Sequence, residues 1–359
     1  MLVLGLESSC DDCSAAVVEE TASGPKILSL ASRGQDYLHA PFGGVVPELA
    51  AREHLLQLRA VCQEALSTAG TKASGLNRIA ATQGPGLIGC LLTGYSAAKA
   101  MAWHSDIPFV GVHHLLGHLN AARFGEPGLP FPALALLVSG GHTHLYLANS
   151  WLDMRLLMKT RDDAAGEAFD KTARMLNLGY PGGPIVDKLA QLADDTAPGF
   201  TVPKFRDGMP SWSFSGLKTA IRQRIEKSPN LSNAGEESDE VRSLCKSVNG
   251  TIADWLLRPL PSLAHDHKAA SLVISGGVAC NSELRRRAIE LGEKCNVKVA
   301  LPKPNLCTDN GAMVAAAGVL LPPSSAPGSE KWAGNADAAL KLSNQKRGDT
   351  ICKYSLGKT

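Results

Sequence analysis

Apolar and polar residues follow two different periods along this chain, and these periods predict its strands and helices. Residues 2–7 and 14–18 are short apolar stretches on either side of a polar turn, which predicts a β-hairpin. Residues 48–69 place apolar side chains every three to four positions, so they predict a long helix that Pro47 opens and Gly70 ends.

The remaining elements alternate in the same way. Further strands are predicted at 28–32, 78–82, 108–112, 133–138, 142–148, 271–274 and 297–301. Further helices are predicted at 91–103, 113–123, 163–178, from 185, and at 217–226, 241–263, 281–294 and 309–321. The first hairpin pattern returns at 134–148, about 130 residues later, which indicates a duplicated lobe. Helices that alternate with buried strands favour an α/β fold with mixed or parallel sheets.

A short segment divides the two predicted lobes. Residues 125–132 contain three prolines and two glycines, which is typical of a linker. We therefore expect an N-terminal lobe at 1–124 and a C-terminal lobe at 130–321, with a flexible polar insert at 228–239. Residues 322–359 form a polar tail that we expect to contribute little to the core.

Composition limits the classes of protein that fit. The chain has 359 residues, of which 44% are hydrophobic and 19% charged, and this suits a globular protein of two lobes. A net charge of +2 excludes a strongly basic nucleic-acid binder but not a local basic patch. We find no apolar run of membrane-spanning length and no targeting segment. Nine cysteines without a disulfide-framework spacing fit a reducing compartment.

Two histidines lie one helical turn apart and are the first candidate for chemistry. His114 and His118 share a helix face, and imidazoles in this arrangement can hold one metal ion. Asp309 is a third candidate ligand, and two nitrogen donors with one oxygen donor suit Fe, Zn or Mn acting as a Lewis acid. Two hydrogen-bonded histidines without a metal are the alternative. A zincin-type protease is disfavoured, because Leu115 stands where its general base would be.

Glycine turns follow several of the predicted strands. Ser139-Gly140-Gly141 and Ser275-Gly276-Gly277 each end an apolar strand, and paired glycines let a backbone approach an anion closely. Gly84-Pro85-Gly86 is a further turn of this kind. Each turn taken alone is better explained by chain reversal, but together they favour a nucleotide. Neither Ser-Gly-Gly turn is a Walker loop, since no Gly-Lys-Ser/Thr follows.

Acidic and basic side chains give two weaker signals. Glu7, Asp11 and Asp12 surround the first hairpin turn, where a carboxylate can orient a nucleophile or take a proton, or simply form the turn. A basic segment with two aromatic residues could bind phosphates and stack bases, or could be a charged helix face beside core aromatics. Its members are Lys204, Arg206, Trp212, Phe214, Lys218, Arg222 and Arg224.

Eight motifs occur in an order that resembles a known family. They are ESSCDD (7–12), GGVVPELA (43–50), HHLLGH (113–118), LVSGGHT (137–143), GEAFDK (166–171), YPGGP (180–184), SFSGLK (213–218) and CTDNG (307–311). This pattern resembles the Kae1/TsaD/Qri7 family of tRNA N6-adenosine threonylcarbamoyltransferases over about residues 2–321. The resemblance implies a duplicated actin/Hsp70-like (ASKHA) fold, with a nucleotide cleft between two lobes.

The resemblance also implies an activity and a set of site residues. The activity is transfer of threonylcarbamoyl from threonylcarbamoyl-adenylate to N6 of adenosine 37, in tRNAs reading codons that start with A, with release of AMP. His114, His118 and Asp309 would bind one divalent metal ion per subunit, Fe or Zn, and Asp11 would be the acid needed for transfer. The adenylate, or ATP or AMP, would contact Leu137, Val138, Ser139, Gly140, Gly141, Asp170, Gly183, Asp187 and Asn281.

Partners and location follow from the branch of the family. We expect tRNA as substrate, a separate synthase that supplies the adenylate, and no membrane association. The Asp11-Asp12 pair and the cysteine count favour the mitochondrial branch, which implies a homodimer in the mitochondrial matrix. The bacterial branch would imply partner proteins in the cytoplasm. Leu137 stands where some members carry Tyr, so we expect no Tyr metal ligand. An actin-like kinase or ATPase is the alternative, and it would not need His114 and His118.

Overall fold

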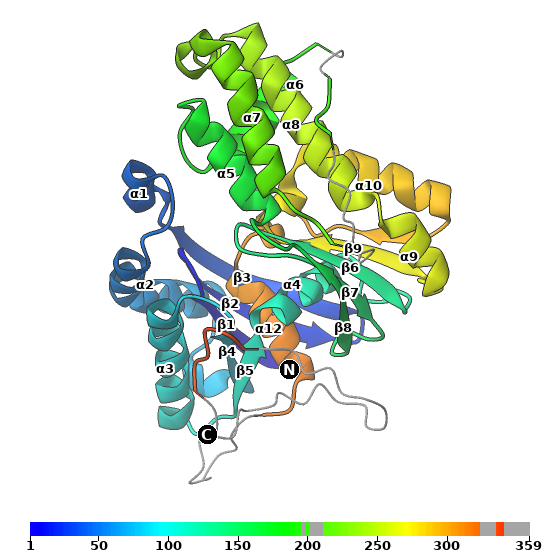
Figure 1. Ribbon diagram of the computed structural model, residues 1–359. Helices are drawn as coiled ribbons and strands as arrows, with labels where there is room; N and C mark the ends of the chain where they lie inside the picture. Colours follow the sequence, from blue (N-terminus) through cyan, green and yellow to red (C-terminus); the bar gives the residue numbers. More distant parts are fainter. Residues whose placement is uncertain (195–197, 202–210, 324–334, 341–359) are drawn as a thin grey trace.

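The computed structural model describes residues 1–194, 198–201, 211–323 and 335–340. It contains two five-stranded sheets, with strand orders β3-β2-β1-β4-β5 and β10-β9-β6-β7-β8, and helices pack around both (Figure 1). The first sheet consists of β1 (Leu2–Glu7), β2 (Asp12–Thr21), β3 (Gly24–Gly34), β4 (Arg78–Gly84) and β5 (Phe109–His113). The second consists of β6 (Ala133–Val138), β7 (Thr143–Ala148), β8 (Met154–Lys159), β9 (Ser271–Ser275) and β10 (Lys298–Ala300).

The two sheets have the same connectivity, which confirms the predicted duplication. In the first, β1 pairs antiparallel with β2 and parallel with β4, and β4 pairs parallel with β5. In the second, β6 pairs antiparallel with β7 and parallel with β9, and β9 pairs parallel with β10. Parallel strands end at one edge of a sheet, so the loops after β1, β4 and β5 gather there, and so do those after β6 and β9.

The helices cover these sheets. Those of the first half are α1 (Asp36–His39), α2 (Pro47–Thr68), α3 (Ile88–His104) and α4 (His114–Asn120). Those of the second half are α5 (Ala165–Met175), α6 (Gly182–Gln191), α7 (Ser215–Lys227), α8 (Asp239–Leu257), α9 (Leu260–Asp266), α10 (Ser282–Cys295), α11 (Pro304–Cys307) and α12 (Gly311–Leu320). None of the described helices combines the length and the apolarity needed to cross a bilayer.

Helix α12 crosses from the second half of the sequence to the first sheet. It packs against β1, β2, β4 and α4, and its side chains join the same apolar cluster as Val3 and Leu116. The crossing is close, because a Cβ on Gly5 of β1 would lie 2.2 Å from the carbonyl oxygen of Gly311. Small residues at both surfaces therefore allow this contact, which carries the segment just before α12 to the end of β1.

Several local predictions differ from the structure. Strand β8 was not predicted, and the helix expected at 241–263 is divided into α8 and α9 at Pro259, which lacks the N–H that a continuous helix needs. The helix expected at 309–321 begins only at Gly311, after Asn310 caps it. The insert at 228–239 contains a short 3-10 helix, Pro229–Asn233, and Ser238 caps α8.

Part of the tail packs against the first lobe, contrary to our expectation. Leu340 is buried, and its carbonyl oxygen lies 3.0 Å from Nε2 of His113. Gln83 holds the same segment at two points: its Nε2 donates to the Asn335 oxygen at 2.9 Å, and its carbonyl accepts from Asp337 N at 2.8 Å. The rest of the tail lies outside the described residues. The eight described cysteines are free thiols.

Candidate metal and nucleotide site

His114 and His118 lie on α4, directly after β5. The preceding His113 ends the strand and caps the helix, because its Nδ1 accepts a hydrogen bond from Leu115 N at 3.2 Å. His114 and His118 are both buried, and their ring centroids are 4.7 Å apart. The strand-to-helix turn therefore aims both imidazoles at one point.

Asp309 reaches the same point from the segment between α11 and α12. Asn310 fixes its position, since Asn310 Oδ1 accepts from Met313 N at 2.9 Å and so starts α12. Asp309 Oδ1 lies 3.1 Å from Nε2 of His118 and 3.5 Å from Nε2 of His114. The structure thus brings together the three residues that the sequence nominated as ligands.

These donor atoms fit a divalent metal ion. Metal–ligand distances near ~2.1 Å place neighbouring donors roughly 3.0–3.5 Å apart, the range that the two Nε2–Oδ1 distances occupy. Among the described residues, Nδ1 of the buried His118 has no hydrogen-bond partner, and Nε2 faces only the Asp309 carboxylate. Two buried imidazoles that face one carboxylate are the arrangement that a cation would complete.

Charge coupling within this group is strong. Burial lowers the pKa of His114, but the carboxylates of Asp309 and Glu7 outweigh it and raise this pKa from 6.5 to about 9. Burial raises the pKa of Asp309, but the two histidines hold it well below its usual range. Without a metal, the group therefore binds a proton on His114 near neutral pH. That proton and a metal ion compete for one position.

Glu7 is a buried carboxylate behind His114. Its Oε2 lies 3.3 Å from His114 Nδ1 and accepts a hydrogen bond from Thr82 Oγ1 at 2.6 Å, while Oε1 accepts from Ser9 N at 2.6 Å. A carboxylate on Nδ1 fixes the imidazole tautomer and leaves Nε2 free as a metal donor. The sequence had left Glu7 open between orienting a nucleophile or taking a proton and forming the turn, so its contact with His114 comes from the structure.

His142 is a site residue that sequence reasoning missed. It lies in the turn after β6, and its ring centroid is 6.1 Å from that of His114. Burial and the nearby His114 and His144 lower its pKa to about 3, so the ring is neutral and offers a nitrogen donor. The only signal for His142 in the sequence is its place directly after the Ser139-Gly140-Gly141 turn. We had interpreted that turn as a phosphate site and not as part of a metal site.

The two Ser-Gly-Gly turns lie side by side. Leu137 and Val138 end β6, and the turn closes with Ser139 N donating to His142 O at 2.8 Å. Gly276 has a φ of 96°, and a Cβ there would lie 2.3 Å from the oxygen of Val138. Space is open instead above Gly140, Gly141, Gly183 and Gly277. Their backbone is therefore accessible to a ligand.

Asp170, Asp187 and Asn281 order the helices around these turns. Asp170 Oδ1 accepts from Gly182 N at 2.8 Å and so fixes the start of α6. Asn281 caps α10 through Leu284 N at 2.9 Å. Asn249, which the sequence had not indicated, links Asp187 to Asn281. Its side chain donates to Asp187 at 2.9 Å and accepts from Asn281 Nδ2 at 2.5 Å.

Asp11 lies in the turn between β1 and β2, and Asp12 begins β2. Burial raises the pKa values of Asp170 and Tyr180, and the negative charge of Asp11 adds to both shifts. Burial, followed by the charges of Asp309 and Asp11, raises the pKa of Asp12 to about 8. The hairpin turn therefore offers two carboxyl groups in the same region.

Base stacking on Trp212 and Phe214 is excluded. Both side chains are buried in the core of the second lobe, and Trp212 Nε1 donates to Trp255 O at 2.8 Å. The alternative interpretation, core aromatics beside a charged helix face, is therefore the right one. Lys204 and Arg206 lie outside the described residues.

Known structures share this architecture. The chain superposes on component A of the (R)-2-hydroxyglutaryl-CoA dehydratase of Acidaminococcus fermentans with a TM-score of 0.54, covering 89% of this chain and 97% of that one at 13% identity. It superposes on HypF of T. kodakarensis with a TM-score of 0.57, covering 89% and 47% at 15% identity. These likenesses show the fold alone. Fold and site together define an actin-like (ASKHA) α/β protein with a candidate His-His-Asp metal centre.

Sequence comparison then shows the family. Residues 26–316 match the TsaD model, described as tRNA N6-adenosine threonylcarbamoyltransferase. Proteins so named from Trichlorobacter lovleyi and Pelobacter propionicus are 44% and 46% identical to this chain, each over 89% of it and 91% of the relative. The chain belongs to this family, whose members form t6A by transferring threonylcarbamoyl to adenosine 37 of tRNA. This decides for the transferase over the kinase or ATPase alternative.

Proposed function

We propose that His114, His118 and Asp309 hold one iron or zinc ion that takes part in t6A formation. The observation that carries this proposal is the pair of 3.1 Å and 3.5 Å distances from Asp309 Oδ1 to the two imidazoles of α4. Asp309 lies far from α4 in the sequence and reaches it only in the folded protein. A divalent ion held there supplies Lewis-acid polarisation of the carbamoyl carbonyl or neutralises the leaving phosphate. Glu7 keeps His114 in the tautomer that this role needs.

The glycine turns beside these residues are proposed to hold threonylcarbamoyl-adenylate, or ATP or AMP. Open space above Gly140, Gly141 and Gly183 supports close approach of a phosphate to backbone N–H groups. The proposed adenylate contacts are Leu137, Val138, Ser139, Gly140, Gly141, Asp170, Gly183, Asp187 and Asn281. Because both polar atoms of Asn281 already bond within the protein, we assign this residue to positioning α10 beside the ligand.

The transfer step is proposed to use a carboxylate of the first hairpin. N6 of the adenosine bonds to the carbamoyl carbon, the bond from that carbon to the AMP phosphate oxygen breaks, and N6 loses one proton. Asp11 is proposed to take this proton, since it belongs to the turn after β1, whose last residue Glu7 lies beside His114. The neighbouring Asp12, with its pKa raised to about 8, keeps a proton in this region at neutral pH.

A transfer assay with labelled threonylcarbamoyl-adenylate and an adenosine-37 tRNA tests the metal proposal. We expect His118→Ala and Asp309→Ala to lose bound metal and transfer together. His104→Ala is the matched control, since His104 is an exposed histidine on α3 and should change neither. A His118→Ala protein with full metal content and full rate would overturn the metal assignment.

We further propose that a partner protein docks on α2 and α3. These helices pack side by side, and Leu55, Leu56 and Leu92 are 69%, 76% and 50% exposed. Both relatives quoted above are bacterial, which supports a partner-dependent protein in a bacterial cytoplasm. Neither relative supports a location in the mitochondrial matrix. Light scattering of the purified protein tests this: a stable dimer that transfers without additions would favour the homodimer.

A further inference from the structure

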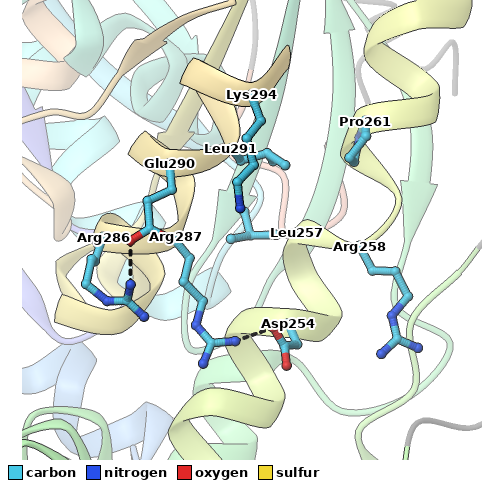
Figure 2. A pocket seen from close by; sticks show the side chains of 9 residues that line it. All are labelled: Asp254, Leu257, Arg258, Pro261, Arg286, Arg287, Glu290, Leu291 and Lys294. Atoms are coloured by element: carbon cyan, nitrogen blue, oxygen red, sulfur yellow. Dashed lines mark hydrogen bonds and ion pairs between the residues drawn. The ribbon is translucent and has the colours of Figure 1, made fainter. Parts of the chain in front are cut away.

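A groove with a basic rim lies in the second lobe, away from the candidate metal group. It has a volume of about 560 Å³ and runs between α10 on one side and α8 and α9 on the other. Four cations line it, with apolar residues on its floor (Figure 2): Arg258, Arg286, Arg287, Lys294, Leu257 and Leu291. The groove thus combines positively charged side chains with an apolar surface.

Positive charge exceeds negative charge in this groove. Only two carboxylates, Asp254 and Glu290, line it against the four cations. Arg287 pairs with Asp254 and Glu283, and Arg286 with Glu290 and Glu283. Arg258 and Lys294 are exposed, and neither side chain has a hydrogen bond or ion pair within the described residues. These two cations are therefore available to an anionic ligand, and the paired arginines add to the local field.

The groove leads away from the nucleotide turns. Helix α10 follows Asn281, which bonds to Asn249 of α8 at 2.5 Å beside the second Ser-Gly-Gly turn. At a rise of ~1.5 Å per residue, Arg287 lies roughly 9 Å and Lys294 roughly 20 Å along the helix from Asn281. The two helices thus carry the groove from the edge of the candidate adenylate site outward across the second lobe.

We propose that this groove binds the sugar–phosphate backbone of the tRNA substrate. The inference rests on the family's tRNA substrate and adds the surface that holds it. Backbone contacts come mainly from Arg and Lys and position a nucleic acid without reading its sequence. Arg258 and Lys294 meet phosphates, while Leu257 and Leu291 offer an apolar floor to ribose. The aromatic segment around Trp212 cannot serve here, because its rings are buried.

The test compares two double variants in the full chain. Arg258→Ala/Lys294→Ala removes both free cations of the groove, and Lys26→Ala/Lys72→Ala removes two exposed lysines of the first lobe as a charge-matched control. We expect the groove variant to raise the KM for tRNA about ten-fold, with kcat and the KM for threonylcarbamoyl-adenylate unchanged. In a plot of the logarithm of the tRNA binding constant against the logarithm of salt concentration, the slope should become shallower by about 0.7–0.9 for each lost phosphate contact.

The outcomes are separable. A groove variant that matches the control in tRNA KM and in salt slope overturns the proposal. Arg258→Glu/Lys294→Glu should weaken tRNA binding further than the alanine variant, and equal binding would also count against the proposal. Thermal unfolding of each variant checks the fold. Absence of transfer by the unmodified protein, even with bacterial partner proteins supplied, would contradict the function itself rather than the groove.

Discussion

Oε2 of Glu7 lies 3.3 Å from Nδ1 of His114, so the first strand of the chain holds the ring whose other nitrogen faces Asp309. We expect Glu7→Gln, which preserves volume but removes the charge, to weaken metal binding about 10–100-fold. Competition with a chelator of known affinity measures this. Glu48→Gln, on the exposed face of α2, is the control. Unchanged metal affinity in Glu7→Gln would show that Ser9, whose Oγ lies 3.2 Å from the same Nδ1, suffices to orient the ring.

Metal binding should release a proton. In the metal-free protein His114 has a pKa of about 9, so its ring is protonated at pH 7.5, whereas a metal ligand must be neutral. We expect release of about one proton per ion at pH 7.5 and much less above pH 9. Titration calorimetry in two buffers of different ionisation enthalpy counts the protons. A zero count at pH 7.5 would contradict the raised pKa.

The metal-free protein should lose stability in mild alkali. The folded-state pKa of His114 is raised from 6.5 to about 9, so its contribution is fully present below about pH 6.5 and disappears as the pH rises through 9. Urea unfolding in the presence of a chelator, repeated from pH 6 to 9.5, should show this decline. His114→Gln removes this titrating group, so its decline should be smaller and should end near pH 8, where Asp12 still titrates.

Gly276 and Gly277 should respond differently to alanine. Gly276→Ala places a Cβ 2.3 Å from Val138 O at a φ of 96°, so we expect a loss of about 1–3 kcal/mol in unfolding free energy. Gly277→Ala meets open space and should fold normally. Chemical denaturation compares the two. If Gly277→Ala raises the KM for threonylcarbamoyl-adenylate at unchanged stability, the open face of the turn contacts the nucleotide.

The docked tail segment should contribute to stability. Leu340 is 5% exposed, and its carbonyl bonds to His113 beside α4. We expect Leu340→Ala to lower the free energy of unfolding by about 2 kcal/mol, the low end for a buried leucine. Ala339→Gly is a neighbouring control that removes less apolar surface. An unchanged melting temperature in Leu340→Ala would restore the view of a tail without a role in the core.

The pair His114 and His118 shows what a local pattern can predict. Helical spacing places both rings on one face wherever α4 packs, so the pair was visible without a structure. Most strands and helices were predicted for the same reason, and the recurrence of the hairpin at 134–148 indicated the duplicated fold. The failures were also local: Pro259 divides a predicted helix, and the weak alternation in Met154–Lys159 concealed β8.

The sequence by itself determined the elements, the duplication, the family and the donors available for a metal. Only the tertiary structure decided that α12 packs on the first sheet, which places Asp309 against α4, and that Glu7 and His142 lie beside His114. It likewise decided that Asn249 links Asp187 to Asn281. It also decided that Trp212 is core and that Leu340 is buried. The physical reason is range. Backbone hydrogen bonds and side-chain periodicity act over a few residues, whereas residues hundreds of positions apart meet only through the packing of the whole core.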